Sequence, residues 1–426
     1  MTVTVFLVSL CGAMFLGMPV AFALLVCGVS LMIHLNSFDA QILAQNLVSG
    51  ADNFPLMAIP FFMLAGEIMN KGGISHQIVK VANALVGHIE GGLGYVAIIA
   101  ALILASISGS AAADSAALAA VVIPMMRKAN YNVGRSAGLI AGAACIAPIL
   151  PPAMPLVLFG VAAQLSITKL FFTGIFPGLI MAVSLVITWK LVARKDFANS
   201  PKQQFNLPEL LKATREAIWA LLLPFIIIGG MKSGMFTPTE AAVVAAVVAL
   251  IVSVFIYRGM KLSDLPHILL ASAKTASSIM LIVAASMVSA WLITIADIPA
   301  QVTEMMAPFM DNKLLLMIIL MILVFAVGTA LDLAPTVLIL TPVLMPLVKA
   351  AGIDPYYFGI MFMMNNAIGL ITPPVGTVLN VVSSVARVNL DTVIKGMFPF
   401  LIAETLVMFL LVAFPQLVTV PARWFY

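Results

Sequence analysis

Long apolar runs, divided by short polar segments, follow one another along almost the whole chain. In the first half they cover residues 2–35, 55–70, 92–126, 134–163 and 168–193, and the first run breaks at Gly17-Met18-Pro19. A helix that crosses a bilayer needs about 20 mostly apolar residues. The runs are continuous rather than alternating, which favours spanning helices over a β-barrel. The pattern predicts an all-α polytopic membrane protein.

The same order of runs returns in the second half of the chain. These runs cover residues 217–231, 238–257, 278–296, 313–348, 356–386 and 390–421. The segments 74–90, 259–277 and 299–312 are amphipathic, and we expect 74–90 and 299–312 to lie along the membrane surface.

The two halves superpose without a gap when Pro124 is placed on Pro346 and the register is kept. Of the six prolines in residues 115–180, four fall on a proline of the second half. The other matches are Pro151-Pro152 with Pro373-Pro374, and Pro177 with Pro399. At ordinary proline density, chance gives fewer than about one match. The sequence predicts an internal repeat, with residues 1–193 as the first unit, 194–215 as a linker and 216–426 as the second unit.

Charge bias predicts that the two units have opposite orientations. The basic linker and the loop 127–135, with its three basic residues, are expected on the cytoplasmic side. The loop equivalent to 127–135 is 349–355, which has one Lys and one Asp, and the segment 36–54 has two Asp and no Lys or Arg. Both are therefore expected outside, and the repeat is predicted to be inverted, as in many secondary transporters.

Two apolar runs in each unit are interrupted by small, hydroxyl-bearing or proline residues. They are the predicted re-entrant hairpins at 92–126 and 313–348, interrupted at 106–110 and 328–332, and the predicted broken helices at 134–163 and 356–386, interrupted at 148–152 and 369–374. Each unit then has about five spans plus one hairpin, and the odd number of spans inverts the second unit. Irregular backbone is tolerated at membrane depth only where protein or a water-filled cavity covers it. The four interruptions should therefore meet at one buried polar site.

Composition and charge agree with a membrane protein and exclude other classes. The chain has 63% apolar and 9% charged residues, and its mean hydropathy is +1.16. This composition excludes a water-soluble enzyme, a disordered chain and a nucleic-acid-binding protein. The three cysteines lie in apolar runs, with no spacing typical of a metal site or a disulfide framework. No glycine-rich phosphate loop is present, so the chain is not expected to hydrolyse ATP.

The interruptions supply oxygen ligands suited to sodium. Glycine permits unwound backbone, and proline frees an upstream carbonyl, so carbonyl and hydroxyl oxygens become available to a hard cation. We expect at least two Na⁺ sites related by the repeat. The first is predicted from Ser106, Ser108, Ser110 and the carbonyls of Ala147 and Leu150; the second is predicted from Gly328, Thr329, Gly369, Thr372 and the carbonyl of Val375.

Two acidic residues follow the hairpin tips at membrane depth. Ionisable groups inside a membrane are costly, which makes Asp114 and Asp332 candidates for shaping the sodium sites and the substrate cavity. The alternative is a helix N-cap, which both positions also fit. The predicted substrate-binding set is Ser108, Ser110, Asp114, Asp332, Asn366 and Thr377. Other charged residues in apolar segments are expected to be structural or interfacial: Glu67, Glu240, Lys274 and Glu404.

Four ordered strings resemble the large membrane subunit of TRAP transporters, the tripartite ATP-independent periplasmic carriers. They are IPFFMLAGEIM (59–69), SGSAAADSAALAAVVIPMM (108–126), GMFTPTEAA (234–242) and LITPPVGTVLN (370–380). Ser108, Ser110 and Asp114 match the family's first hairpin motif, and Asp332 matches the second.

The resemblance carries expectations beyond the residues themselves. It implies Na⁺-driven uptake of an organic acid across the bacterial inner membrane by an elevator-type movement. It also implies two partners, a small membrane subunit and a periplasmic substrate-binding protein. The strings TPPVGTVLNVV and APTVLILTPVLMPLV resemble the sialic-acid and sugar-acid branch more than the C4-dicarboxylate branch, which stays an alternative.

Two other classes of function remain as rivals. An ion channel also uses re-entrant loops, although an inverted repeat with two meeting hairpin tips favours a carrier. An intramembrane serine protease needs a histidine at membrane depth near its serine. His88 and His267 instead lie in amphipathic segments, so no enzyme is expected.

Overall fold

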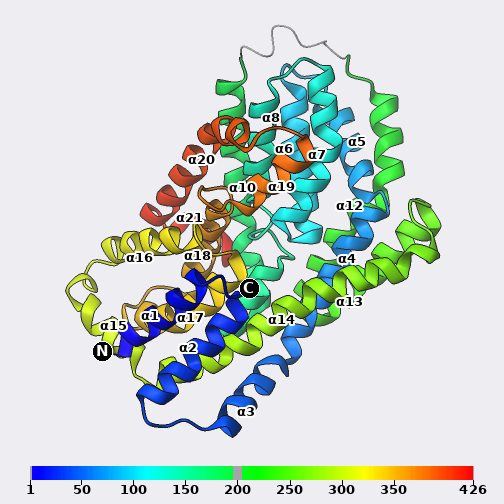
Figure 1. Cartoon of the computed structure of the whole chain (residues 1–426). Helices are drawn as coiled ribbons and strands as arrows, with labels where there is room; N and C mark the ends of the chain where they lie inside the picture. Colours follow the sequence, from blue (N-terminus) through cyan, green and yellow to red (C-terminus); the bar gives the residue numbers. More distant parts are fainter. Residues whose placement is uncertain (1, 195–203, 426) are drawn as a thin grey trace.

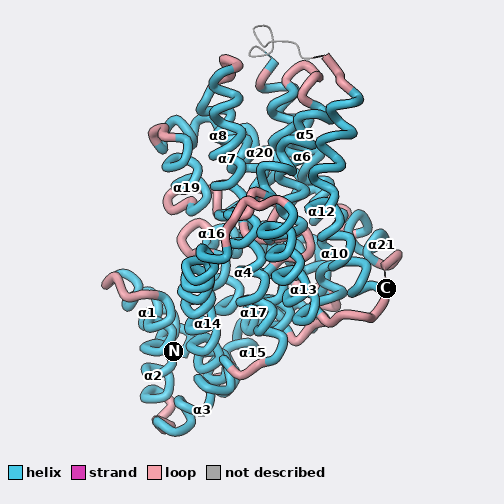
Figure 2. The backbone as a smooth tube through the Cα atoms, turned by 90° about the vertical axis from the view of Figure 1, so that its right-hand side faces the viewer, coloured by secondary structure: helices cyan, strands magenta, loops and turns pink. Residues whose placement is uncertain are grey.

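The computed structural model describes residues 2–194 and 204–425, and within these ranges every regular element is helical. Figure 1 and Figure 2 both show α6, α7 and α8 gathered in the upper part of the molecule and α1, α2 and α3 in the lower part. The helices of the first half are α1 (Thr2–Phe15), α2 (Val20–His34), α3 (Ala40–Ala51), η1 (Phe54–Met57), α4 (Ala58–Lys71), α5 (Ile74–Val86), α6 (Gly92–Ser108), α7 (Ala111–Lys128), α8 (Val133–Ala144), α9 (Met154–Ala163) and α10 (Ile167–Val192).

The second half repeats this order of helices. Its elements are α12 (Leu207–Lys232), α13 (Pro238–Ile251), η2 (Val252–Ile256), η3 (Leu262–Asp264), α14 (Leu265–Ile295), α15 (Ile298–Met306), η4 (Ala307–Phe309), α16 (Lys313–Gly328), α17 (Leu333–Ala350), α18 (Pro355–Gly369), α19 (Thr377–Ala386), α20 (Leu390–Ala413) and α21 (Gln416–Ala422). The matched prolines define a register between the two halves. In that register α7 begins and ends at the same positions as α17. The ends of α6 lie within two residues of those of α16, and the ends of α9 within one residue of those of α19.

Equivalent helices of the two halves run in opposite directions. Ser184 of α10 hydrogen-bonds to Glu404 of α20 at 3.2 Å, and Trp189 of α10 stacks on Phe400 of α20 with ring centroids 6.4 Å apart. As α10 advances from 184 to 189, its partner positions in α20 fall from 404 to 400, so the two helices are antiparallel. Both are long and apolar enough to cross a membrane. The repeat is therefore inverted.

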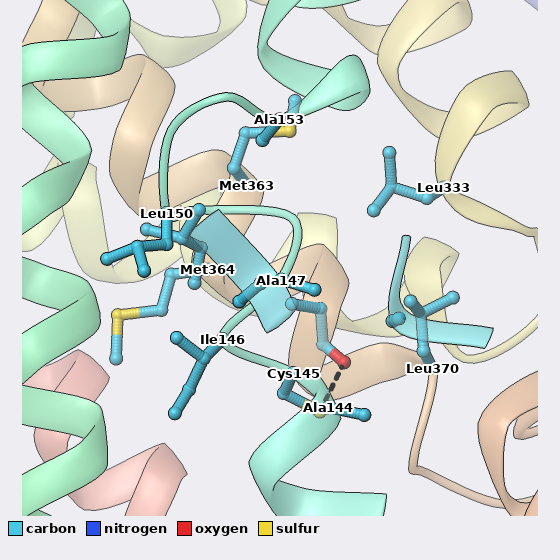
Figure 3. Packing of buried hydrophobic residues seen from close by; sticks show 14 of the residues in the cluster. Ala144, Cys145, Ile146, Ala147, Leu150, Ala153, Leu333, Met363, Met364 and Leu370 are labelled. Carbon is cyan, nitrogen blue, oxygen red and sulfur yellow. Dashed lines mark hydrogen bonds between the residues drawn. The ribbon is translucent and has the colours of Figure 1, made fainter. Parts of the chain in front are cut away.

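A residue that contacts its own repeat equivalent marks the pseudo-twofold axis. The thiol of Cys145 donates to the carbonyl of Ala367, its equivalent in the second half, at 3.1 Å. Figure 3 shows this contact where α8 ends. The packing is reciprocal around it, since α9 packs on α17 as α19 packs on α7, and α2 packs on α14 as α13 packs on α4. The ends of the two broken helices thus meet at the centre of the molecule.

Hydropathy and length select candidate spans in the described part of the chain, among them α17 of the predicted second hairpin. Five helices pass as single spans, and the bent pair of α3 with η1 and α4, which turns by 54°, gives a sixth. Helices α1, α2, α6, α9, α16 and α19 are apolar but shorter. The break between α1 and α2 lies at residues 16–19, as predicted.

The structure differs from the sequence prediction at four places. The polar stretch 36–54 contains α3, because Asp39 caps it by accepting from the amides of Gln41 and Ile42. Residues 207–215 of the predicted linker belong to α12, whereas 195–203 lie outside the described residues. The segments 259–277 and 278–296, predicted as separate, form the single helix α14 from residue 265 to 295.

The fourth difference concerns the amphipathic segments that predicted surface helices. The apolar face of α5 packs against α6 and α12, and α15 packs against α17. Their amphipathic pattern is therefore explained by packing on neighbouring helices as well as by a membrane surface.

The ends of the molecule give a first testable prediction about sidedness. Helix α3, which Ser37 precedes, lies at the lower end in both views, and α7, which Lys128 ends, lies in the upper part. In a background lacking the exposed Cys11 and the buried Cys27 and Cys145, Ser37→Cys should react with an impermeant thiol reagent from outside intact cells. Lys128→Cys should react only after the cells are opened. Labelling of both positions from the same side would contradict the orientation.

Candidate functional site

The tip of the first hairpin, between α6 and α7, needs a glycine. Gly109 adopts a left-handed φ of 62°. A Cβ atom on Gly109 would lie 2.6 Å from the carbonyl oxygen of Pro152 and 2.7 Å from the Cα of Ala153. Ser110 caps α7 by accepting from the amide of Ala113. The hairpin tip is therefore pressed directly against the break between α8 and α9.

Asp114 lies in the first turn of α7 and is almost fully buried, at 1% exposure. The hydroxyl of Ser108 donates to its Oδ1, and the amide of Ser110 donates to the Ser108 hydroxyl at 3.2 Å. Its Oδ2 has no hydrogen-bond partner among the described residues. Because Ser110 occupies the N-cap, Asp114 is not the cap of α7. It instead leaves one carboxylate oxygen available beside the hairpin tip.

The first helix break frees backbone oxygens. Residues 145–153 separate α8 from α9, and Pro148, Pro151 and Pro152 supply no N–H. No hydrogen bond to the carbonyl of Ala147 or Leu150 is found in the described ranges. Figure 3 shows both residues in this loop, next to Met363 and Met364 of α18. The two carbonyls predicted as sodium ligands are therefore not used by the protein's own backbone.

The tip of the second hairpin, between α16 and α17, presents a second carboxylate. Asp332 occupies the N-cap position of α17, but its side chain makes no capping hydrogen bond. Its backbone carbonyl accepts from the hydroxyl of Thr336 at 2.9 Å, and the residue is exposed. The N-cap alternative therefore explains the position of Asp332 and leaves its carboxylate free.

The second hairpin also contacts the second helix break at close range. A Cβ atom on Gly369 would lie 2.7 Å from the carbonyl oxygen of Gly328, and one on Gly328 would lie 3.1 Å from Oδ1 of Asn366. Asn366 is 1% exposed, and its Oδ1 has no hydrogen-bond partner in the described part of the chain. Three of the predicted residues thus come together around an unpaired amide oxygen.

Other predicted ligands are partly engaged by the protein. The hydroxyl of Thr372 donates to the carbonyl of Ile368 at 2.8 Å, and that of Ser106 donates to the carbonyl of Ile103 at 2.7 Å. A hydroxyl that donates its proton in this way still offers lone pairs to a cation. Two carbonyls of the second set already accept a hydrogen bond: that of Val375 from the Asn380 side chain at 2.8 Å, and that of Gly369 from the amide of Thr372 at 3.0 Å. Thr329 donates to the carbonyl of Ala326.

Both hairpin tips and both helix breaks line one cavity of about 780 Å³. Four helix N-termini reach it, those of α7, α9, α17 and α19, and each is represented by lining residues: Ser110 to Ala112, Met154 and Pro155, Leu333 to Pro335, and Thr377 and Val378. The N-terminus of a helix carries partial positive charge and unpaired N–H groups, which favour an anion. The predicted convergence of the four interruptions is therefore observed.

The predicted substrate residues divide between the cavity and its surroundings. Ser110, Asp332 and Thr377 line the large cavity. Ser108 lines a smaller cavity of about 250 Å³ next to it, with Ser110 and Glu67. Asp114 and Asn366 line neither cavity; both are buried beside the tips, where an unpaired oxygen suits a cation better than an anionic substrate.

The cavity also has a wall that the sequence analysis did not anticipate. Residues from Pro19 to Phe22 and one face of α14 complete it, with Lys274, Thr275 and Ser278 as the polar groups of α14. Lys274 and Glu67 were expected to be structural or interfacial, yet both line cavities at the hairpin tips. The polar positions 274, 275 and 278 recur at helical spacing and so share one face of a helix, which is the signal that locates this wall.

The two other charged residues expected to be structural have packing partners that fit that role. Glu240 forms a capping box with Thr237 at the start of α13, where the Thr237 amide donates to its carboxylate at 2.7 Å. Glu404 is buried between α20 and α10 against Ser184.

Comparison with known proteins finds one family model that covers nearly all of the chain. Residues 7–417 match the model described as "Tripartite ATP-independent periplasmic transporter, DctM component". The 2,3-diketo-L-gulonate TRAP transporter large permease protein of Escherichia coli is 53% identical, over 100% of both chains. The sialic acid TRAP transporter large permease protein of Vibrio cholerae is 38% identical, over 95% of both.

More distant similarities agree with these. The C4-dicarboxylate TRAP transporter large permease protein of Pseudomonas aeruginosa is 35% identical, over 90% of this chain and 89% of the relative. Among solved structures, the YdaH transporter of Alcanivorax borkumensis superposes with a TM-score of 0.64 at 16% identity, over 88% of this chain and 89% of that one. At that identity the structural match supports the fold alone.

Proposed function

The chain belongs to the DctM family, the large membrane subunits of TRAP transporters, and on that premise we propose that it imports a sugar acid in a step coupled to sodium. It is a multi-pass protein of the bacterial inner membrane and a transporter subunit rather than an enzyme. The observation that carries the proposal is the single cavity on which two hairpin tips and four helix N-termini converge. This arrangement suits a carboxylate at the centre of an inverted repeat.

Sodium coupling is proposed from the oxygen atoms beside the cavity. The first site would use the free carbonyls of Ala147 and Leu150 with Ser106, and the unpaired Oδ2 of Asp114 supplies negative charge next to it. The second would use Gly328, Gly369 and Thr372, to which the unpaired Oδ1 of Asn366 is added. Carbonyl, hydroxyl and carboxylate oxygens are the ligands that hard cations prefer. Sodium in both sites would offset the charge of an incoming acid.

Removing one hydroxyl ligand should weaken sodium binding without unfolding the protein. We expect Thr372→Val and Ser106→Ala each to raise the sodium concentration for half-maximal uptake by about tenfold, because each removes an interaction with a charged group. Matched controls are Thr405→Val in α20 and Ser30→Ala in α2. Their hydroxyls likewise donate to a carbonyl of the preceding helical turn, each at 2.8 Å. If both site variants keep the wild-type sodium dependence, these residues are not ligands.

The substrate is proposed to be a sugar acid of the diketogulonate type. The relative named for 2,3-diketo-L-gulonate is 53% identical, and those named for sialic acid and C4-dicarboxylates are 38% and 35% identical. The sequence motifs favoured sialic acid or a related sugar acid. Because the diketogulonate relative has the higher identity, we propose a sugar acid of that type rather than sialic acid. Uptake of 2,3-diketo-L-gulonate, N-acetylneuraminate and succinate, each at matched concentration, tests the ranking. Preferential uptake of succinate would overturn it.

Two partners are part of the proposal. A small membrane subunit would pack on the lipid-facing side of this chain, and a periplasmic binding protein would deliver the acid to the external opening. The relatives are named as large permease proteins of TRAP transporters, a family whose description is tripartite. Uptake that is lost without either partner, and restored when both are added back, would support this assembly.

A further inference from the structure

We propose that Lys274 of α14 binds the carboxylate of the transported acid and sets the preference for anions. The inference rests on the proposed function, because it names a residue that recognises the cargo in the same cavity. It adds a cationic group on a helix outside the hairpins and the broken helices.

The position of Lys274 is the first argument. It lines the large cavity together with Thr275, Ser278, Leu281 and Ile282 of the same helix. These positions lie on one stripe of a helix with 3.6 residues per turn. The stripe is polar at one end and apolar at the other, which suits a molecule with a charged carboxylate and a less polar remainder.

The charge of the cavity is the second argument. Among the described residues that line it, Lys274 is the only one with a basic side chain, and Asp332 the only one with an acidic side chain. Lys274 is exposed to the cavity, and no carboxylate of the described residues forms an ion pair with its ammonium. The carboxylate of Asp114 accepts a hydrogen bond from Ser108 and does not line this cavity, and Glu67 lines only the smaller cavity. Neither therefore adds negative charge to the lining of the large cavity.

The depth of Lys274 is the third argument. It is the tenth residue of a helix of 31 residues, Leu265 to Ile295, inside a segment long and apolar enough to span the membrane. A lysine at this depth is costly unless it pairs with an opposite charge or faces water. Lys274 meets this condition by facing the cavity, and because no carboxylate of the described residues forms an ion pair with it, its ammonium is available to an anionic substrate.

The repeat provides a fourth argument. In the register of the repeat, the position equivalent to Lys274 in the first half is Asp52, and the position equivalent to Asp332 is Ser110. The helix framework is thus repeated, whereas the charges that line the cavity are not. Lys274 is therefore not required by the architecture of the repeat, which points to a role in recognition.

Substitution of Lys274 gives a direct test in proteoliposomes with a saturating sodium gradient. We expect Lys274→Met, which keeps the unbranched apolar stem and removes the ammonium, to raise the half-saturation concentration for 2,3-diketo-L-gulonate by about 10- to 100-fold. The half-maximal sodium concentration should be unchanged. Lys274→Arg, which keeps the charge, should retain most of the affinity. Lys71→Met is the matched control, since Lys71 is exposed in the last turn of α4 and lines neither cavity.

Chemical restoration of the charge separates recognition from folding. Lys274→Cys in the cysteine-free background should lose affinity and recover it after reaction with 2-aminoethyl methanethiosulfonate, which adds a cationic ammonium. The neutral methyl methanethiosulfonate should give no recovery. The acid itself should slow both reactions by occupying the cavity.

The outcomes distinguish this inference from the function on which it rests. If the wild type takes up none of the acids named above in a sodium-dependent way, the proposed function fails. If the wild type transports one of them and Lys274→Met keeps its half-saturation concentration, the proposed function stands and the role of Lys274 is wrong. Equal recovery with the cationic and neutral reagents would also overturn it, because side-chain volume rather than charge would then explain the loss.

Discussion

Replacing Gly109 by alanine is expected to reduce uptake by at least about 100-fold while the protein still inserts in the membrane. A methyl group at this position would lie 2.6 Å from the carbonyl oxygen of Pro152 and 2.7 Å from the Cα of Ala153. Both neighbours are backbone atoms, so the hairpin tip must shift away from the helix break. A misplacement of about 1 Å at a site of this kind costs about 100-fold in rate. The measurement is sodium-driven uptake normalised to the amount of protein in the membrane.

Two other glycines separate the steric effect from the backbone effect. Gly234 also has a left-handed φ, of 74°, but a Cβ there meets no atom within 4 Å. Gly234→Ala is therefore expected to destabilise the protein only by placing an L-residue in the left-handed conformation, by about 1–2 kcal/mol. Gly12→Ala, in α1 with open space around it, controls for the substitution itself. Should Gly234→Ala and Gly109→Ala lose the same uptake, contact between tip and break is not the cause.

Joining α17 to α14 by a disulfide is expected to stop uptake completely and reversibly. In an elevator-type movement, which the resemblance to TRAP transporters implies, we expect the hairpins and broken helices to travel together against a scaffold that includes α1, α2, α12 and α13. Helix α14 packs on α2, α3 and α4, and it also contacts α17 of the second hairpin. The contacts place α14 and α15 rather than α13 beside α17, so the pair to screen first is Ile282→Cys with Ile339→Cys, which share a buried cluster.

A crosslink within the scaffold is the control for this experiment. The Cβ of a residue at position 28 would lie 4.0 Å from the Cβ of Val288, within the range that disulfides require. Gly28→Cys with Val288→Cys should therefore crosslink α2 to α14 and leave uptake intact. Pairs from α14 to α17 that crosslink in high yield should block uptake, and reduction should restore it. High-yield crosslinks that leave transport unchanged would replace the elevator with a rocking or gated-pore mechanism.

The hairpins and helix breaks could be predicted from sequence because their signals are local. Glycine, serine and proline interrupt otherwise apolar runs at 106–110 and 369–374, and the register of the repeat shows the interruptions to be paired. Irregular backbone at membrane depth must be covered by protein or line a water-filled cavity, because lipid cannot satisfy its polar groups. Symmetric interruptions therefore imply a common buried site. The structure agrees with this prediction, since Gly109 lies against Pro152 and Gly369 lies against Gly328, so that each hairpin tip contacts a helix break.

What the sequence could not provide depends on packing between distant segments. Helix α14 continues through Lys274 because it packs on α2, α3 and α4, whereas the change from amphipathic to apolar sequence predicted two separate segments, 259–277 and 278–296. Lys274 was consequently interpreted as structural or interfacial, and its position at a cavity wall was missed. Asn366 was assigned to the substrate because it is polar and lies near a break, but its burial beside Gly328 fits a cation ligand better.

Counterflow in proteoliposomes is the direct test of sodium-coupled carriage of an organic acid by this chain. Vesicles that contain this chain with its small subunit are loaded with unlabelled 2,3-diketo-L-gulonate. They are then diluted into trace labelled acid and the binding protein, with sodium present on both sides. For a sodium-coupled carrier we expect the label to rise transiently above its equilibrium level, its rate of entry to saturate with acid concentration, and the overshoot to disappear when potassium replaces sodium. Entry of the label that only approaches equilibrium, at the same rate in sodium and potassium, would indicate a channel and rule out a sodium-coupled carrier.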